Sequence, residues 1–238
     1  VQTTKVDAEY PDHKLTGAVF EVYVDVDGDQ AYRAETDRFI GEMSEVETGV
    51  YRMDGLQYNG YFLHEKTSPE GFLKDDNYYY FEIREDGETV TVENEADVGF
   101  VNQPITGKLE LTKKDISDGK LLPGVGFRIW NEQGEIVTEG YTDQNGIAEF
   151  TLRYGKYTYQ EFDPLDNYQP DETEYPFEIR ENGEIVKAEM TNERIPTPEV
   201  PQTGDDTNLG FWIGLGAVAL GALVSLVIIQ IKRKKDDE

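Results

Sequence analysis

The chain of 238 residues carries one sequence pattern twice, and this duplication limits its possible architecture more than any single motif does. Three landmarks recur in the same order: Thr4–Phe20 with Thr112–Phe127, Tyr61–Phe72 with Tyr157–Tyr168, and Val101–Pro104 with Thr191–Pro196. Matched landmarks in one order indicate two copies of one domain, joined near Thr106 and Gly107.

Each copy is rich in short strand signals. In the first copy, β-branched and aromatic segments are separated by Gly, Asp and Asn, and they cover Ala18–Val24, Gly49–Met53, Tyr58–Glu65, Tyr78–Arg84 and Thr89–Glu93. No segment before the C-terminal tail shows the periodicity of an amphipathic helix. The sequence therefore predicts an all-β fold of two tandem immunoglobulin-like β-sandwiches.

Three polar residue types fall on the predicted core face of these strands. Alternate residues of a strand share a face. By this rule Lys113 follows Leu109 and Leu111, Glu161 follows Tyr157 and Tyr159, and Asn192 follows Val186, Ala188 and Met190. In the first copy Glu65 follows Tyr61 and Leu63, and Asn102 follows Val98 and Phe100. The parity of Lys5 is open because too little sequence precedes it.

Two interpretations of this pattern stay open at this stage. Lys and Glu are rarely buried without a partner, so each copy could hold a buried ion pair with an Asn hydrogen-bonded beside it. The other interpretation is covalent. Burial lowers the pKa of a lysine and raises the pKa of a glutamate. A neutral amine is a nucleophile, and a protonated glutamate can polarise an amide and relay protons.

The combination T-K-x-D, G-x-x-F, Y-x-x-x-E and a C-terminal Asn resembles the collagen-adhesin B-type domain (CnaB, SpaA-like) of Gram-positive surface proteins and pilins. The resemblance implies a prealbumin-like sandwich with a self-formed isopeptide bond. Lys5 would join Asn102 with assistance from Glu65, and Lys113 would join Asn192 with assistance from Glu161. Asn94 is an alternative partner in the first copy, and the loop after Glu161 matches the family only in part.

The tail has the composition of a membrane anchor. Phe211–Ile231 holds 21 residues, of which only Ser225 and Gln230 are clearly polar, and Lys232–Lys235 are four consecutive cations. About 20 apolar residues span a bilayer, and cations mark the cytoplasmic end. A buried core helix would show a polar face, which this run lacks. We expect residues 205–238 to form a transmembrane helix with a basic tail.

The pentapeptide before this run resembles the LPxTG sorting signal of Gram-positive wall proteins. It consists of Val200, Pro201, Gln202, Thr203 and Gly204, with Val in place of the usual Leu. The resemblance implies cleavage by a sortase between Thr203 and Gly204. The carbonyl carbon of Thr203 would be joined to an amine of a peptidoglycan precursor or of a pilin lysine. The membrane would therefore hold the chain only before sorting.

Composition narrows the possible partners. The net charge of −27 argues against nucleic acid, because phosphate binding requires clustered cations. The chain has no cysteine, so disulfides cannot stiffen it. No signal peptide stands at Val1, and we expect a longer secreted precursor.

The sequence predicts no metal site and no other cofactor. Asp25–Asp29 lacks the residue order of a calcium loop, and His13 and His64 are isolated.

The expected organisation is a sandwich at 1–106, a second at 107–193, a proline-containing spacer with the sorting motif at 194–204, and the tail at 205–238. This predicts a non-enzymatic, wall-anchored surface stalk or pilin subunit, with Lys14 as a candidate polymerising lysine. The alternatives are an adhesin module that binds a host or matrix protein, and the stalk of an upstream surface enzyme.

Overall fold

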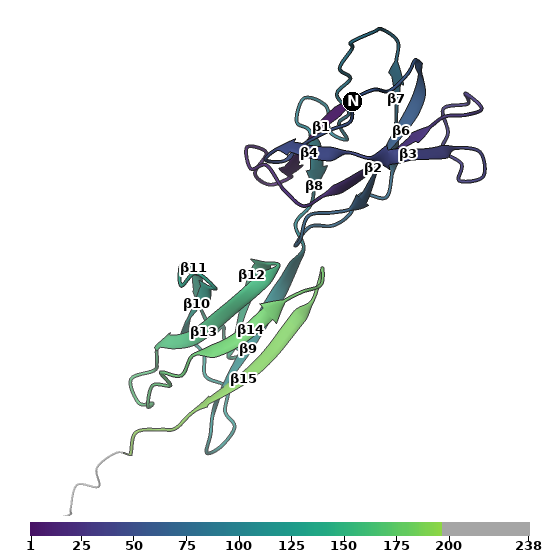
Figure 1. Ribbon diagram of the computed structural model, residues 1–238. Helices are drawn as coiled ribbons and strands as arrows, with labels where there is room; N and C mark the ends of the chain where they lie inside the picture. Colours follow the sequence, from purple (N-terminus) through teal and green to yellow (C-terminus); the bar gives the residue numbers. More distant parts are fainter. Residues whose placement is uncertain (197–238) are drawn as a thin grey trace, which may run out of the picture. The chain divides into compact units, whose positions relative to one another are not determined.

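The computed structural model describes residues 1–196, which form strands and turns (Figure 1). The sorting motif, the apolar run and the basic tail lie outside the described residues. Among residues 1–196 there is no helix with the length and apolarity needed to cross a membrane.

The first half forms two four-stranded sheets. Its strands are β1 (Gln2–Asp7), β2 (Val19–Val24), β3 (Arg38–Glu42), β4 (Ser44–Glu47), β5 (Val50–Arg52), β6 (Asn59–Thr67), β7 (Tyr78–Ile83) and β8 (Phe100–Asn102). One sheet has the order β4-β5-β1-β8 and the other has the order β3-β2-β6-β7. Side chains from both sheets meet in one core, which includes Phe20, Tyr51, Leu63 and Phe100, so the sheets form a sandwich.

The second half repeats this plan with one strand fewer. Its strands are β9 (Thr106–Asp115), β10 (Gly126–Asn131), β11 (Ile136–Tyr141), β12 (Ile147–Arg153), β13 (Gly155–Asp163), β14 (Tyr175–Ile179) and β15 (Ile185–Asn192). The sheets are β12-β9-β15 and β11-β10-β13-β14, and β4 has no counterpart. Leu109, Phe127, Phe150 and Tyr159 lie in a second core. The two-sandwich expectation and the repeat in the sequence therefore correspond to two separate hydrophobic cores.

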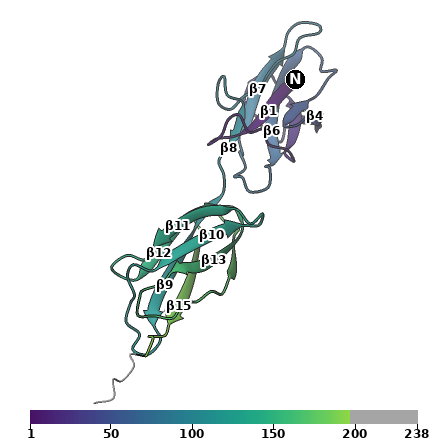
Figure 2. The same cartoon turned by 90° about the vertical axis from the view of Figure 1, so that its left-hand side faces the viewer.

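The first and last strands of each sandwich are parallel neighbours. β1 pairs with β8, and β9 pairs with β15 (Figure 1, Figure 2). The register is the same in both: Asn102 lies opposite Asp7, and Asn192 lies opposite Asp115. Each Asn is thus opposite the residue two positions after the lysine, and alternation places lysine and Asn on the same face of the sheet. That face is the core face, because Lys5 and Lys113 are fully buried.

Four of the five strands predicted in the first copy are present within two residues of their expected bounds. The prediction of a strand at Thr89–Glu93 is wrong. This segment forms only the isolated bridge between Thr91 and Gln2, with backbone bonds on either side from Gln2 to Val90 and from Val92 to Gln2. β1 begins at Gln2, so this segment meets only the start of the strand. β3 and β4 were not predicted, because their alternation is masked by charged, exposed residues.

Gly99 allows β8 to lie close to β1. Its φ is +136°, and a Cβ atom there would lie 2.8 Å from the carbonyl oxygen of Thr4. Real Cβ atoms do not approach backbone oxygen this closely, so a side chain at this position would displace β8, which begins at the next residue.

We expect Gly99→Ala to lower the free energy of unfolding of the first sandwich more than Gly87→Ala does. A side chain in such a backbone region costs about 1–3 kcal/mol. Gly87 also has a positive φ, of +76°, but its Cβ would meet nothing within 4 Å, so it serves as the matched control. Urea denaturation of the recombinant chain measures the difference. Equal midpoints for the two variants would contradict the close approach of β8 to β1.

Candidate functional site

The first Lys–Glu–Asn site is built by three strands from both sheets. Lys5 lies on β1, Glu65 on β6 and Asn102 on β8. Their exposed fractions are 0%, 0% and 2%. Glu65 and Asn102 thus point into the core as their parity predicts, and Lys5, whose parity was open, does so too. Strand alternation explains this placement, because Thr3 and Asp7 of β1 are buried on the same face.

Glu65 is the common partner in this site. The side-chain amide of Asn102 donates to both carboxylate oxygens, with Nδ2–O distances of 2.9 Å each. The Lys5 Nζ atom lies 3.6 Å from Glu65 Oε1 and donates to the carbonyl oxygen of Phe100 at 2.8 Å. It also lies 4.9 Å from the centre of the Phe100 ring. The site is therefore assembled around one buried carboxyl group.

Burial shifts both ionisable groups toward their neutral forms. It lowers the pKa of Lys5 from 10.5 to about 8, and the attraction of Glu65 opposes this only in part. Burial raises the pKa of Glu65, while the charge of Lys5 and hydrogen bonds from Asp75 and Asn102 oppose that rise. A neutral amine and a protonated carboxyl group are the forms that suit amide chemistry.

The second Lys–Glu–Asn site has the same members in the same strand positions. Lys113 lies on β9, Glu161 on β13 and Asn192 on β15, and all three are buried. Asn192 Nδ2 donates to Glu161 Oε1 at 2.7 Å. Lys113 Nζ lies 2.6 Å from Glu161 Oε2, which is an ion-pair distance, but their directions do not satisfy hydrogen-bond geometry.

Both sites leave the same atom without a partner. Within residues 1–196, the carbonyl oxygens Asn102 Oδ1 and Asn192 Oδ1 are buried and accept no hydrogen bond. Buried polar atoms are nearly always bonded, so these exceptions call for an explanation. In each site the amide nitrogen donates to the carboxyl group, and the lysine amine lies within 3.6 Å of the same carboxyl group. This arrangement suits attack by the amine on the amide, with glutamate beside the departing nitrogen.

The structure separates the other candidates from these sites. Asn94 is half-buried and lies outside the strands, and it bonds to Asp75 and to Val101. Lys14 is exposed. His64 is only 8% exposed, because it stacks on the ring of Tyr78 at 4.2 Å.

The carboxylates of the acidic turn at Asp25–Asp29 accept hydrogen bonds and ion pairs from nearby groups of the chain. The carboxylates of Asp25, Asp27 and Asp29 lie within 4.8 Å of one another. Asp25 accepts the backbone N–H groups of Gly28 and Gln30, and the guanidinium of Arg33 bridges Asp27 and Asp29. These contacts favour the interpretation as a turn.

Sequence reasoning missed one carboxylate that recurs in both copies. Asp75 accepts from the hydroxyl of Tyr79 at 2.6 Å, and Asp171 accepts from the hydroxyl of Tyr175 at 2.8 Å. The shared spacing D-x-[NT]-x-Y was the available signal. In the first copy, the backbone N–H of Asp75 also donates to Glu65 Oε2 at 2.9 Å, so Asp75 belongs to the surroundings of the site.

Aromatic side chains gather on the outer face of β2, β6 and β7. Tyr23, Tyr32 and Tyr78 are half-buried because they pack on one another, with the rings of Tyr32 and Tyr78 stacked at 3.5 Å. Tyr80 packs on Phe62 in the same way. The tyrosines of this cluster therefore serve in packing across neighbouring strands.

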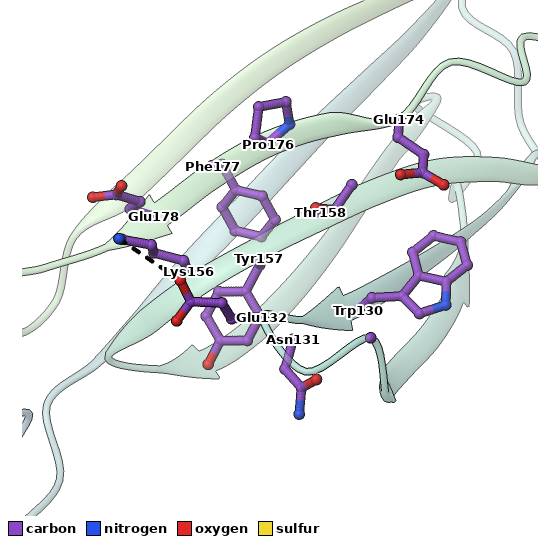
Figure 3. A pocket seen from close by; sticks show the side chains of 11 residues that line it. Trp130, Asn131, Glu132, Lys156, Tyr157, Thr158, Glu174, Pro176, Phe177 and Glu178 are labelled. Atoms are coloured by element: carbon purple, nitrogen blue, oxygen red, sulfur yellow. Dashed lines mark ion pairs between the residues drawn. The ribbon is translucent and has the colours of Figure 1, made fainter.

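A pocket of about 720 Å³ lies over β10, β13 and β14 of the second sandwich (Figure 3). Trp130, Thr158 and Pro176 line it, and Lys156 pairs with Glu132 at its border at 3.8 Å. Its lining includes no member of the second Lys–Glu–Asn site. The pocket is therefore separate from the second Lys–Glu–Asn site.

The lowered pKa of Lys5 predicts a specific pH dependence of stability. In an Asn102→Ala chain the amine stays free. The unfolded chain then holds the amine proton more tightly than the folded chain, because the folded pKa is about 8 and the ordinary value is 10.5. The contribution of Lys5 to stability is thus present above pH 10.5 and is lost as the pH falls through 8.

Urea midpoints of Asn102→Ala and of Asn102→Ala with Lys5→Met, measured at pH 7 and pH 10, test this prediction. The chain with Lys5 should gain up to roughly 3 kcal/mol relative to the double variant as the pH rises. The double variant cancels the titration of the groups that do not interact with Lys5. Parallel behaviour of the two chains would show that the amine is not held in a desolvating environment.

Comparisons with known proteins agree with this architecture. The prealbumin-like fold domain named SpaA matches residues 1–96 and 107–194. No curated protein matches the chain. Among solved structures, the TIE protein of Bacillus anthracis is 32% identical with a TM-score of 0.66, and the match covers 82% of this chain and 34% of that one. The present chain thus spans about a third of the TIE protein structure.

A second solved structure has a similar fold at low identity. The C-terminal fragment of the pilus adhesin SpaC from Lactobacillus rhamnosus GG is 14% identical with a TM-score of 0.54, and the match covers 83% of this chain and 97% of that one. Because the SpaA-type match covers most of residues 1–196 in two copies, the chain belongs to the family of SpaA prealbumin-like fold domains.

Proposed function

We propose that this chain is a wall-anchored stalk or pilin subunit whose two sandwiches are each closed by an intramolecular Lys–Asn isopeptide bond. The observation that carries the proposal is the repetition of one buried Lys–Glu–Asn site at identical strand positions in both copies. Family membership supports the proposal, and the names of solved relatives include a pilus adhesin.

The chemistry requires only the residues of each site. Neutral lysine Nζ attacks Cγ of the asparagine, and a new C–N bond forms. The glutamate carboxyl group stands beside the amide nitrogen, where it can pass a proton from the attacking amine to the departing one. The bond from Cγ to Nδ2 breaks and ammonia leaves. Each site reacts once, so the chain is not an enzyme in the sense of turnover.

A buried ion pair without reaction is the competing interpretation of the same geometry. Isolated buried charges cost several kcal/mol each, and pairing offsets this only when the geometry is good. In the first site the amine is 3.6 Å from the carboxylate and bonds instead to Phe100, which is a poor geometry for a stabilising pair. In the first site this favours the covalent proposal over the ion pair, whereas in the second site Lys113 Nζ and Glu161 Oε2 are at an ion-pair distance of 2.6 Å.

Intact-mass measurement of the recombinant chain decides between these interpretations. We expect a mass lower than the calculated one by two ammonia molecules. Glu65→Ala and Glu161→Ala should each restore one of them. Glu149→Ala, which removes a surface partner of Lys108, is the matched control and should restore none. An unmodified mass in the parent chain would overturn the covalent proposal and leave buried ion pairs.

The proposed bonds suit a load-bearing role. In each sandwich the first strand runs parallel to the last, so the chain enters and leaves that strand pair at opposite ends. Tension along the chain would load the hydrogen bonds between the two strands in shear. A covalent link between them would carry this load instead, in a chain that has no cysteine.

Wall attachment at Thr203 rests on the sequence of the tail, which lies outside the described residues. We expect an LPxTG-type sortase to cleave the chain between Thr203 and Gly204 and to join Thr203 to a triglycine amine. Mass spectrometry of the product identifies the junction. Thr203→Ala should block the reaction, whereas Thr207→Ala, outside the motif, should leave it intact. Cleavage at another bond, or none, would remove this part of the proposal.

Two alternatives have less support. Direct binding to a host or matrix protein would be favoured by a broad exposed aromatic patch, but the half-buried rings of Tyr23, Tyr32 and Tyr78 pack on one another. A stalk for an upstream enzyme uses the same two sandwiches and differs only in what precedes them. Exposed Lys14 remains the candidate amine for a pilin role.

A further inference from the structure

Asn94 makes an unusual set of bonds to a single backbone position. Its side-chain Oδ1 accepts from the N–H of Val101 at 2.6 Å, and its Nδ2 donates to the carbonyl oxygen of Val101 at 2.9 Å. An asparagine amide carries the same donor and acceptor as a peptide group, so it can pair with a strand as another strand would. Val101 is the central residue of β8, and the next residue is Asn102.

The strand that Asn94 binds needs such support. β8 has three residues and lies at the edge of its sheet, with β1 on one side only. An edge strand exposes unpaired backbone groups on its open side. Asn94 pairs with the backbone of Val101 and so holds the short strand that carries the reactive asparagine.

The same side chain is tied back to the acid of the first site. Asn94 Nδ2 also donates to Asp75 Oδ2 at 2.9 Å, and the backbone N–H of Asp75 donates to Glu65 Oε2 at 2.9 Å. Glu65 in turn accepts from Asn102. Glu65, Asp75, Asn94, Val101 and Asn102 therefore form a closed ring of hydrogen bonds and one peptide linkage. The ring fixes the amide of Asn102 relative to the carboxyl group.

A surface hollow of about 350 Å³ opens beside this ring. Asp75, Asn94 and Asn102 line it together with Asn77 and Val101. Asn102 itself is only 2% exposed, so the hollow lies at the solvent side of a buried amide.

The second sandwich holds its asparagine in a different way. β15 has eight residues, and all eight pair with β9, ending at Asn192. Asp171 repeats the position of Asp75, but within residues 1–196 the structure gives it no hydrogen bond to Glu161 and no amide comparable to Asn94. In the second copy, the long pairing of β15 with β9 therefore holds Asn192 in place. In the first copy, the side chain of Asn94, which we call the clamp, supports the short strand that carries Asn102.

We propose that Asn94 is a positioning residue that holds β8 so that Asn102 reacts with Lys5, and that the second site needs no such residue. This rests on the proposed isopeptide chemistry. Asn94, which the sequence offered as an alternative isopeptide partner of Lys5, would then position the reacting asparagine instead of reacting itself.

The test follows bond formation in the full chain made by cell-free synthesis with detergent and quenched in acid at intervals. Digestion and mass spectrometry then measure the Lys5–Asn102 and Lys113–Asn192 linked peptides separately. A misplacement of about 1 Å can slow a reaction by roughly 100-fold. We expect Asn94→Ala to slow the first link by about 10- to 100-fold and to leave the second link unchanged as an internal control.

The matched control is Asn77→Ala. Asn77 Nδ2 also donates to Asp75, at 2.7 Å, but Asn77 makes no bond to β8. This variant should form the first link at the parent rate. Equal slowing by both variants would place the effect in Asp75 and overturn the role of the clamp. Parent-like linking in Asn94→Ala would overturn it as well.

Asn94→Asp separates positioning from folding. The introduced carboxylate keeps the acceptor for the Val101 N–H but cannot donate to the Val101 carbonyl, and it repels Asp75. Protonation would restore a donor. The rate relative to the parent should therefore rise as the pH falls toward about 4, at conditions where circular dichroism shows both chains folded. A ratio that does not change with pH would overturn the proposal.

The outcomes also separate this inference from the proposed function. If the parent chain forms neither link, the isopeptide chemistry fails and the clamp has no reaction to support. If the parent forms both links and the Asn94 variants match it, the chemistry stands and only the role of Asn94 is overturned. If Asn94→Ala does not fold, addition of sucrose to restore folding should leave the first link slow; full recovery would show a purely structural role.

Discussion

The burial of an amine from one sheet against a carboxyl group from the other is the constraint on which each sandwich depends. Neither group can remain charged in the core without a large cost in free energy. In the first site burial lowers the pKa of Lys5 to about 8 and raises the pKa of Glu65, so the pair moves toward its neutral forms. The strands of the first copy therefore hold an amine and a carboxyl group that burial shifts toward their neutral forms beside an amide. The second copy buries the same three residue types at the same strand positions.

The last strand that holds the asparagine differs in length between the two copies. In the second, β9 and β15 pair over eight positions and hold Lys113 and Asn192 directly. In the first, β1 and β8 pair over three positions, and side chains of a loop complete the support. Gly99 permits the approach at one end of β8, and Asn94 pairs with its open edge. A shorter last strand thus makes the first site depend on individual residues outside the strands.

This difference explains what could be predicted from the sequence. Alternation identified Lys113, Glu161 and Asn192 on the core face because they follow long regular strands with apolar residues at every second position. The segment from Thr89 to Gly99 has no such regularity, since it forms only two isolated bridges, and the side-chain amide of Asn94 pairs with Val101. Hydrogen bonds from a side chain to a distant backbone group produce no repeating pattern in the sequence that could reveal them. A strand was therefore predicted where only a bridge exists, and the contacts of Asn94 and Asp75 were not foreseen.

The positions of the proposed bonds matter as much as their chemistry. A link from Lys5 to Asn102 would close nearly the whole first sandwich into one loop. In the chain-entropy description, a cross-link that closes about 100 residues destabilises the unfolded chain by about 4.7 kcal/mol. A cross-link between neighbouring strands in mid-sequence would close a shorter loop and would leave one terminal strand free to peel away under tension. Placement between first and last strands gives both the larger entropic effect and a direct covalent path for force. The proposed bonds between the two strands that are furthest apart in the sequence would therefore serve a load-bearing chain better than bonds placed in mid-sequence.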